Sequence, residues 1–256
     1  MKKAARKTTR ISGYDANRIT VRGRDLVGEL MGKVGFSQMI LLQLLGRMPT
    51  RRQAKILDAV LVTIMEHGLV PSAVVSRLTL YGAPESYQGA IAAGLLGVGD
   101  RFAGTASACA EIIDQLVSVP VRQRTAAAVE IVQSHRASKR PIPGFGHPIH
   151  RGGDPRVKKL LAIAREAGAA GDHLRSLSAL ERAVRAEYGG KLVTNVSAAI
   201  AAALGEAGVP AQAMRGIVLT ARCAGLAGHL HEERQDPIAE AMWRAVEKEI
   251  RYQPDE

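Results

Sequence analysis

Apolar residues recur at helical spacing along most of the chain. In "TRRQAKILDAVLVTIMEHG", Ala54, Leu57, Leu61, Ile64 and Met65 fall on one face of a helix. The same spacing occurs in "FSQMILLQLLGRMP" and "RVKKLLAIAREAG", whereas the alternation typical of a strand is confined to a few residues near "RITVRG". The sequence therefore predicts an almost entirely α-helical protein.

Residues that favour helix ends interrupt this pattern. The predicted starts are at Thr50, Pro120 and Asp154-Pro155, and the predicted stops are at Gly46, Gly68 and Gly168. The segments "AIAAGLLGVG" and "NVSAAIAAALGEAG" consist largely of small residues. Such helices can approach one another closely, so we expect them in a tight interior or at a subunit interface.

The chain has 256 residues, of which 46% are hydrophobic, so it can bury a core in one large domain or two small ones. It has no run of eighteen apolar residues and no apolar stretch behind the basic start "MKKAARKTTRISGYD". We therefore expect a cytoplasmic protein without a membrane span or a secretory signal. Cys109 and Cys223 lack the spacing of metal ligands, so both are expected to be structural thiols, and no metal site is predicted.

The formal net charge of +11 is concentrated at one end, because five basic residues lie in the first ten positions. The other basic residues are mixed with acidic ones, and the one Trp, five Tyr and three Phe provide no stacking surface along a basic stripe. No nucleic-acid partner is therefore expected, although binding through the tail of residues 1–10 is an alternative. Small anions such as carboxylates and phosphates are the expected partners.

One loop differs from the rest of the chain. "PIPGFGHPIHRGGDPR" holds four glycines, four prolines, two histidines and two arginines. Glycine backbone can approach a flat ligand, His147 can transfer a proton, and Arg151 and Arg156 can bind carboxylate or phosphate. His67, at the end of a long apolar helix, is a second candidate. The loop is either an anion and carbonyl site or a solvated connection between helices.

Several blocks of this sequence resemble the citrate synthase superfamily. "PGFGHPIHRGGDPR" is similar to the G-[FY]-G-H loop that is followed, nine residues after its histidine, by the arginine of a D-P-R triplet. "EHGLVPS" is similar to the D-H-[EG] segment, and "NVSAAIAAAL" is similar to the N-V-D segment. Arg222 in "LTARCAGLAGHL" resembles a second substrate arginine. The resemblance spans residues 36–229, with the blocks in the family's order.

The resemblance implies an all-α, citrate-synthase-like fold. It divides the chain into a large helical domain of residues 1–103 and 201–256, which includes the basic tail 1–10, and a smaller inserted helical domain of residues 104–200. It also implies a homodimer or homotetramer whose sites lie where domains and subunits meet.

The lyase branch of this superfamily is favoured over the synthase branch. Synthases carry an L-H-G-G-x-N motif whose histidine corresponds to Ala103 here. "GDRFAG" is instead similar to free-standing citryl-CoA lyases and to the C-terminal lyase module of ATP-citrate lyase. The implied reaction is cleavage of (3S)-citryl-CoA, or a related 3-hydroxyacyl-CoA, to acetyl-CoA and oxaloacetate.

The resemblance also implies roles for single residues. His147 and His67 would act at the hydroxyl end of the substrate, and Arg156 and Arg222 would hold its carboxylates. Adenine would lie at the loop Ile142, Pro143, Gly144, Phe145 and Gly146, and a CoA phosphate at Arg151. Coenzyme A enters only as part of substrate and product, so no bound cofactor is expected.

Ser197 departs from the family pattern, because it replaces the aspartate of N-V-D. A hydroxyl can donate a hydrogen bond or hold a water, but it cannot take up a proton at pH 7 as a carboxylate does. Glu66, Asp100, His150 or an ordered water are candidates to replace it. The alternatives are an enzyme for another acyl-CoA, a synthase-type acyltransferase, or a CoA-ester-binding paralogue or regulator without turnover.

Overall fold

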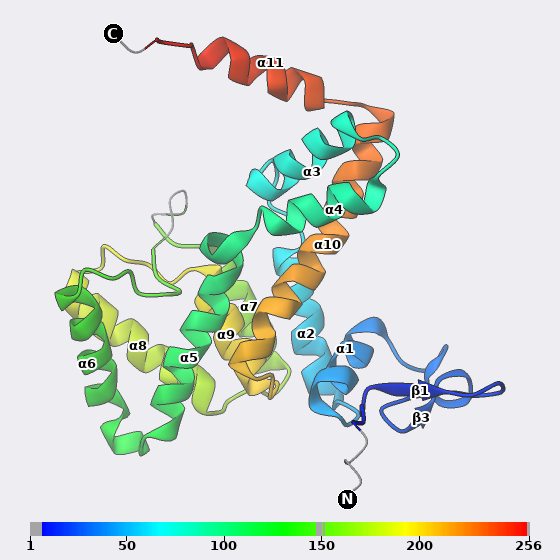
Figure 1. Cartoon of the computed structure of the whole chain (residues 1–256). Coiled ribbons are helices and arrows are strands. Elements are labelled where there is room, and N and C mark those ends of the chain that lie inside the picture. The colour runs from blue at the N-terminus through cyan, green and yellow to red at the C-terminus, as the bar shows by residue number, and fades with distance from the viewer. Residues whose placement is uncertain (1–6, 147–149, 151, 255–256) are drawn as a thin grey trace, which may run out of the picture.

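The computed structural model describes residues 7–146, 150 and 152–254. Helix dominates this part of the chain, with a small sheet at one end (Figure 1). The α-helices are α1 (Phe36–Leu45), α2 (Arg51–Ile64), α3 (Pro71–Gly82), α4 (Tyr87–Leu96), α5 (Thr105–Ser118), α6 (Arg124–Ala137), α7 (Pro155–Glu166), α8 (Asp172–Tyr188), α9 (Val196–Glu206), α10 (Ala211–Gln235) and α11 (Ala239–Glu249). The shorter helical turns are η1 (Leu26–Leu30), η2 (Asp100–Gly104) and η3 (Val121–Gln123). The predicted all-α class is confirmed.

The sheet lies beside α1, where the sequence shows its one strand-like segment. Strands β1 (Ser12–Tyr14), β2 (Ile19–Val21) and β3 (Arg24–Asp25) are antiparallel in the order β1-β2-β3. Val21 packs with Leu30 and Leu42 in a small core of its own. This packing attaches the sheet to the helical body (Figure 1).

Most predicted helix ends are found, and two differ. Thr50 and Gln53 form a capping box that begins α2, and Asp154 caps α7 with a proline at its first position. Gly46 ends α1 in the left-handed conformation. Gly68 also has a positive φ, but α2 ends earlier, at Ile64. Pro120 begins only the short η3, and α6 starts at Arg124 because a single 3₁₀ turn intervenes.

Helix α9 lies at the centre of the molecule and consists almost entirely of small residues. Ala198 to Gly205 are all buried, and α9 packs against α5, α7, α8 and α2. Alanine side chains let these helices approach closely from several sides, so the predicted tight interior is confirmed for this segment. The large core around α9 contains residues of both predicted domains, and the domain division stays a prediction.

The two cysteines are free thiols, as expected. Cys109 is fully buried, and burial raises the pKa of its thiol to about 12, so it stays protonated and unreactive. Cys223 is only partly buried. Within the described part of the chain, no helix has the length and apolar character needed to cross a membrane.

Candidate functional site

A cavity of about 850 Å³ opens where the ends of several helices meet. Its walls come from the starts of α3, α5, α7 and α9, from η2, from the middle of α10 and from the loop of residues 142–146, which we call the glycine loop. The predicted site residues that line it are His67, Ile142, Pro143, Gly144, Phe145, Gly146, Arg156, Ser197 and Arg222. The predicted residues His147 and Arg151 lie outside the described residues. Segments up to 155 positions apart in sequence therefore share one site.

The glycine loop is held in place by the strand-like segment before α9. The backbone N–H of Gly146 donates to the Val193 carbonyl (2.7 Å), and that of Asn195 donates to the Gly144 carbonyl (2.9 Å). The Asn195 side chain donates to the Gly146 carbonyl (2.8 Å) and accepts from Ser197 N–H, which caps α9. One asparagine thus orients both the loop and the first turn of α9.

Gly144 is required for packing as well as for access to a ligand. Its φ is +86°, and a Cβ there would lie 2.7 Å from both the Ala198 Cβ and the Cys109 Sγ. From the sequence, these glycines are expected to allow close approach of a ligand. The structure shows that at Gly144 the close neighbours are α5 and α9.

His67 lies at the cavity wall, close enough to two arginines to be affected by their charge. Burial, followed by the positive charges of Arg156 and Arg222, lowers the pKa of His67 below its ordinary value. The imidazole is therefore mostly neutral at pH 7 and can accept a proton or a hydrogen bond. The His150 ring lies 6.3 Å from it, centroid to centroid.

The two arginines differ in how they are held. Arg156 Nε and Nη2 donate to both carboxylate oxygens of the buried Asp154 (2.9 and 2.8 Å), which fixes the guanidinium at the start of α7. The Arg222 guanidinium donates to no acceptor among the described residues, although burial lowers its pKa. A ligand carboxylate would supply the partner that this half-buried cation lacks.

Gly225 sets the distance between α10 and the end of α2. A Cβ at Gly225 would lie 2.2 Å from the Met65 carbonyl oxygen, so only glycine permits this approach. Arg222 and His229 lie about one turn before and after Gly225 on the same helical face, since residues three or four apart are neighbours. The close approach thus places both side chains beside the Glu66-His67 segment.

The segment before His67 is held by a network of polar side chains that runs from the exposed Glu66 to the buried Arg77, and no sequence pattern predicted it. Glu66 accepts the backbone N–H groups of His67 and Gly68, both at 2.7 Å. His229 Nε2 lies 3.0 Å from Glu66, and its Nδ1 accepts from Arg77 Nε (3.1 Å). The seven-residue spacing from Arg222 was the available signal for His229.

Burial raises the pKa of the Glu66 carboxyl, but the contact with His229 and the backbone donors outweigh it, so the pKa lies below its usual value. Glu66 is therefore ionised at pH 7. It is engaged with these donors and does not line the cavity.

Ser197 forms a hydrogen bond with a second hydroxyl in the cavity wall. Its Oγ lies 2.9 Å from Thr105 Oγ1, at the start of α5. No sequence motif pointed to Thr105. The carboxylates that line the cavity are Asp100, which pairs with Arg215, and Glu111 on α5. No group of three metal-ligating side chains occurs among the residues described.

The chain matches known proteins over most of its length. Residues 2–245 match the family described as "Citrate synthase, C-terminal domain". Citryl-CoA lyase from Hydrogenobacter thermophilus has a similar structure, with a TM-score of 0.87 and 30% identity over 98% of this chain and 95% of that chain. ATP citrate lyase from Methanothrix soehngenii has the same fold (TM-score 0.80, 22% identity, 100% of this chain and 43% of that chain).

A curated relative is named as a synthase. "Putative citrate synthase 2" of Mycobacterium tuberculosis (strain ATCC 25618 / H37Rv) is 28% identical over 194 residues, or 73% of this chain and 49% of its own length. The chain thus spans about half the length of the curated relatives it matches. Since the family match covers nearly all of the sequence, and the cavity is built from the segments that carry it, the chain belongs to the citrate synthase family.

Proposed function

We propose that the protein cleaves (3S)-citryl-CoA, or a related 3-hydroxyacyl-CoA, to acetyl-CoA and oxaloacetate or the corresponding 2-oxo acid. The observation that carries this proposal is that the neutral His67 lines one cavity together with Arg156 and Arg222. That arrangement suits a ligand with carboxylates beside a hydroxyl. The similarity to a citryl-CoA lyase along almost the whole of both chains supports the same reaction.

Substrate binding would begin with the carboxylates. The Arg222 guanidinium donates to no acceptor among the described residues. Asp154 accepts from Nε and Nη2 of Arg156, so Nη1 of Arg156 is the group that a ligand carboxylate would contact. Two such charge-assisted contacts would orient the hydroxyl-bearing carbon toward His67. His147 would contact the same hydroxyl, as the family resemblance implies.

Cleavage requires two proton transfers. The hydroxyl proton passes to a base, the carbon–carbon bond breaks as the hydroxyl carbon becomes a ketone, and the electron pair moves onto the thioester carbonyl as an enolate. The enolate carbon then takes up a proton to give acetyl-CoA. His67 or His147 would accept the first proton, and the Ser197–Thr105 pair would hold a water near the enolate.

The CoA portion would lie along the glycine loop. The residues of the loop Ile142–Gly146 all line the cavity, among them Pro143 and Phe145. Arg151 would bind a CoA phosphate. CoA would enter and leave as part of substrate and product, with no resident cofactor.

A second candidate function is binding of a CoA ester without turnover. The hydroxyl of Ser197 in place of a carboxylate favours it, because loss of a general acid or base typically costs about 10²- to 10⁴-fold in rate. A protein that only binds could still regulate an active paralogue. A third candidate, condensation of acetyl-CoA with oxaloacetate, is favoured by the curated relative's name.

One experiment separates these functions. The purified chain is incubated with citryl-CoA, and separately with acetyl-CoA plus oxaloacetate, and the CoA species are followed by mass spectrometry. Loss of citryl-CoA with formation of acetyl-CoA supports the lyase, and condensation without cleavage supports the synthase-type activity. Binding of CoA with no reaction in either mixture contradicts both. Arg222→Gln, at the arginine that donates to no acceptor among the described residues, is the control that should lose turnover.

A further inference from the structure

A second cavity, of about 430 Å³, lies at the far end of α5 from the candidate site. Thr105 begins α5 in the first cavity, and Leu116, near the end of α5, accepts a hydrogen bond from Arg124, which lines the second. A fourteen-residue helix is roughly 20 Å long, so the two cavities are separated by about that distance. Four arginines from α6, α7 and α8 line the second cavity: Arg124, Arg165, Arg175 and Arg182. We call it the arginine groove.

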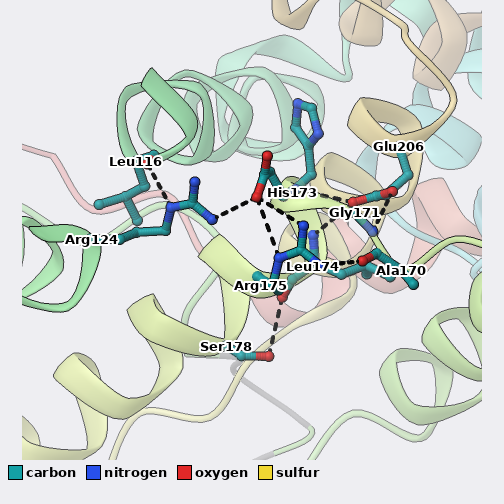
Figure 2. Close-up of polar contacts among 10 residues, drawn as sticks. Leu116, Arg124, Ala170, Gly171, His173, Leu174, Arg175, Ser178 and Glu206 are labelled. Carbon is teal, nitrogen blue, oxygen red and sulfur yellow. Dashed lines mark hydrogen bonds and ion pairs between the residues drawn. The ribbon is translucent and has the colours of Figure 1, made fainter. Parts of the chain in front are cut away.

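Arg124 is a cation held in position before any ligand arrives. It is 4% exposed, its Nε donates to the Leu116 carbonyl (2.9 Å), and its Nη1 donates to Asp172 (3.0 Å). Figure 2 shows its guanidinium between α5 and the start of α8. Its Nη2 donates to no acceptor among the described residues. A fixed guanidinium with an open donor loses little further freedom on binding an anion.

The groove holds more positive than negative charge. Asp172 is shared by Arg124 and Arg175, and hydrogen bonds from both lower its pKa. Arg165 and Arg182 are exposed and form no ion pair with any described residue. The nearby Glu206 accepts the backbone N–H groups of Gly171, His173 and Leu174, so its carboxylate already serves the first turn of α8 (Figure 2).

These observations indicate a ligand that is itself an anion. Four guanidiniums around one cavity repel one another, which is unfavourable unless an anion binds there. An ordinary solvent-exposed surface does not require such a grouping. Guanidiniums match phosphate oxygens with two parallel hydrogen bonds, and a groove with apolar walls increases their attraction for an anion. Val121 and Leu174 form such a wall, and Thr125 adds a hydroxyl.

We propose that the arginine groove binds an oligophosphate anion, either free or as part of a nucleotide. Two phosphates would bridge Arg124 and Arg175 on one side and Arg165 and Arg182 on the other. The wall at Val121 and Leu174 would contact the base of a nucleotide. This site is independent of the proposed lyase activity, since none of its residues lines the first cavity.

The test uses the whole chain and two probes, inorganic pyrophosphate and ADP, with binding followed by calorimetry. Arg165→Gln combined with Arg182→Gln removes two exposed side chains that pair with no described residue, so folding should be unaffected. We expect both probes to bind the wild type and to bind this double variant at least about tenfold more weakly, because each charge-assisted hydrogen bond is a strong one. Thermal unfolding serves as the check of folding.

The matched control is Arg251→Gln, an exposed arginine that follows α11; α11 lies far from α6 and α8 (Figure 1). It should bind both probes as the wild type does. ADP binding more tightly than pyrophosphate indicates that the base contributes, whereas equal affinities indicate the phosphates alone. Failure of the wild type to bind either probe, or equal binding by the folded double variant, would overturn the proposal.

Discussion

Ser197 is the single residue whose chemistry most limits the proposed reaction. Ser197→Asp would place a carboxylate beside Thr105, whose hydroxyl lies within hydrogen-bond distance, at the position where the family has its aspartate. Since the arginines and His67 already line the same cavity, we expect kcat/KM for citryl-CoA cleavage to rise by about tenfold or more. Steady-state kinetics checks this expectation.

Ser197→Ala is the matching control, because it removes the hydroxyl without adding a charge. If activity falls in Ser197→Ala and does not rise in Ser197→Asp, the hydroxyl itself positions a water or a substrate group. The prediction of a missing carboxylate is then wrong.

His67 should titrate below the range of an ordinary histidine. Burial and the charges of Arg156 and Arg222 oppose its protonation, so its pKa in the folded protein lies below the reference of 6.5. The unfolded chain takes up this proton first, so His67 disfavours folding as pH falls through the ordinary value. In an NMR titration of the ring protons, Arg222→Gln should raise the midpoint, because one repelling charge is gone. An unchanged midpoint would show that Arg222 does not act on His67.

At the scale of elements, the glycine loop depends on its contact with α5 and α9. Gly144→Ala should lower the free energy of unfolding by about 2–3 kcal/mol, because the new Cβ overlaps Ala198 and Cys109 and the φ of +86° is unfavourable for alanine. Urea denaturation measures the change. Gly152→Ala, in the same segment but with open space around its Cα, should be tolerated. Equal stability of both variants would mean that the loop adapts.

Helix α10 helps to position His67 through His229, which contacts Glu66. His229→Ala removes the contact with Glu66, whose carboxylate holds the backbone of His67, so we expect kcat/KM for the proposed cleavage to fall ten- to a hundredfold. Free CoA should bind with unchanged affinity, because His229 does not line the cavity. Calorimetry with CoA, beside the kinetics, distinguishes this from general unfolding. Loss of CoA binding in parallel with activity would contradict a positioning role.

For the whole molecule, the expected homodimer or homotetramer has a candidate surface on α11. This helix projects from the body and packs against α3, while Trp243, Val246 and Ile250 remain exposed (Figure 1). Exposed apolar faces of this kind often mark a contact, and we predict that the second copy implied by the family resemblance covers this one. Sedimentation should show at least a dimer at micromolar concentration, and Trp243→Asp should shift it toward monomer. A monomeric wild type, with and without CoA, would contradict this prediction.

Short-range patterns were sufficient for the helical class, for the caps at Thr50 and Asp154, and for the choice of the glycine-rich loop as a candidate site. These features depend on neighbours three to nine positions away, and spacing along the chain records them. The family resemblance predicted that His67, Arg156 and Arg222 belong to one site. No local pattern in the sequence contains that information.

The tertiary structure alone decided what lies beside these residues. Thr105 and Ser197 form a hydrogen bond although they lie 92 positions apart in sequence. Arg77 and His229 do so at a separation of 152 positions. The packing reason for Gly144 and the grouping of the four arginines were likewise invisible, because each depends on how closely α5, α6, α7, α8 and α9 approach one another. Close packing of whole helices sets those distances, and the sequence near any one of the residues does not encode them.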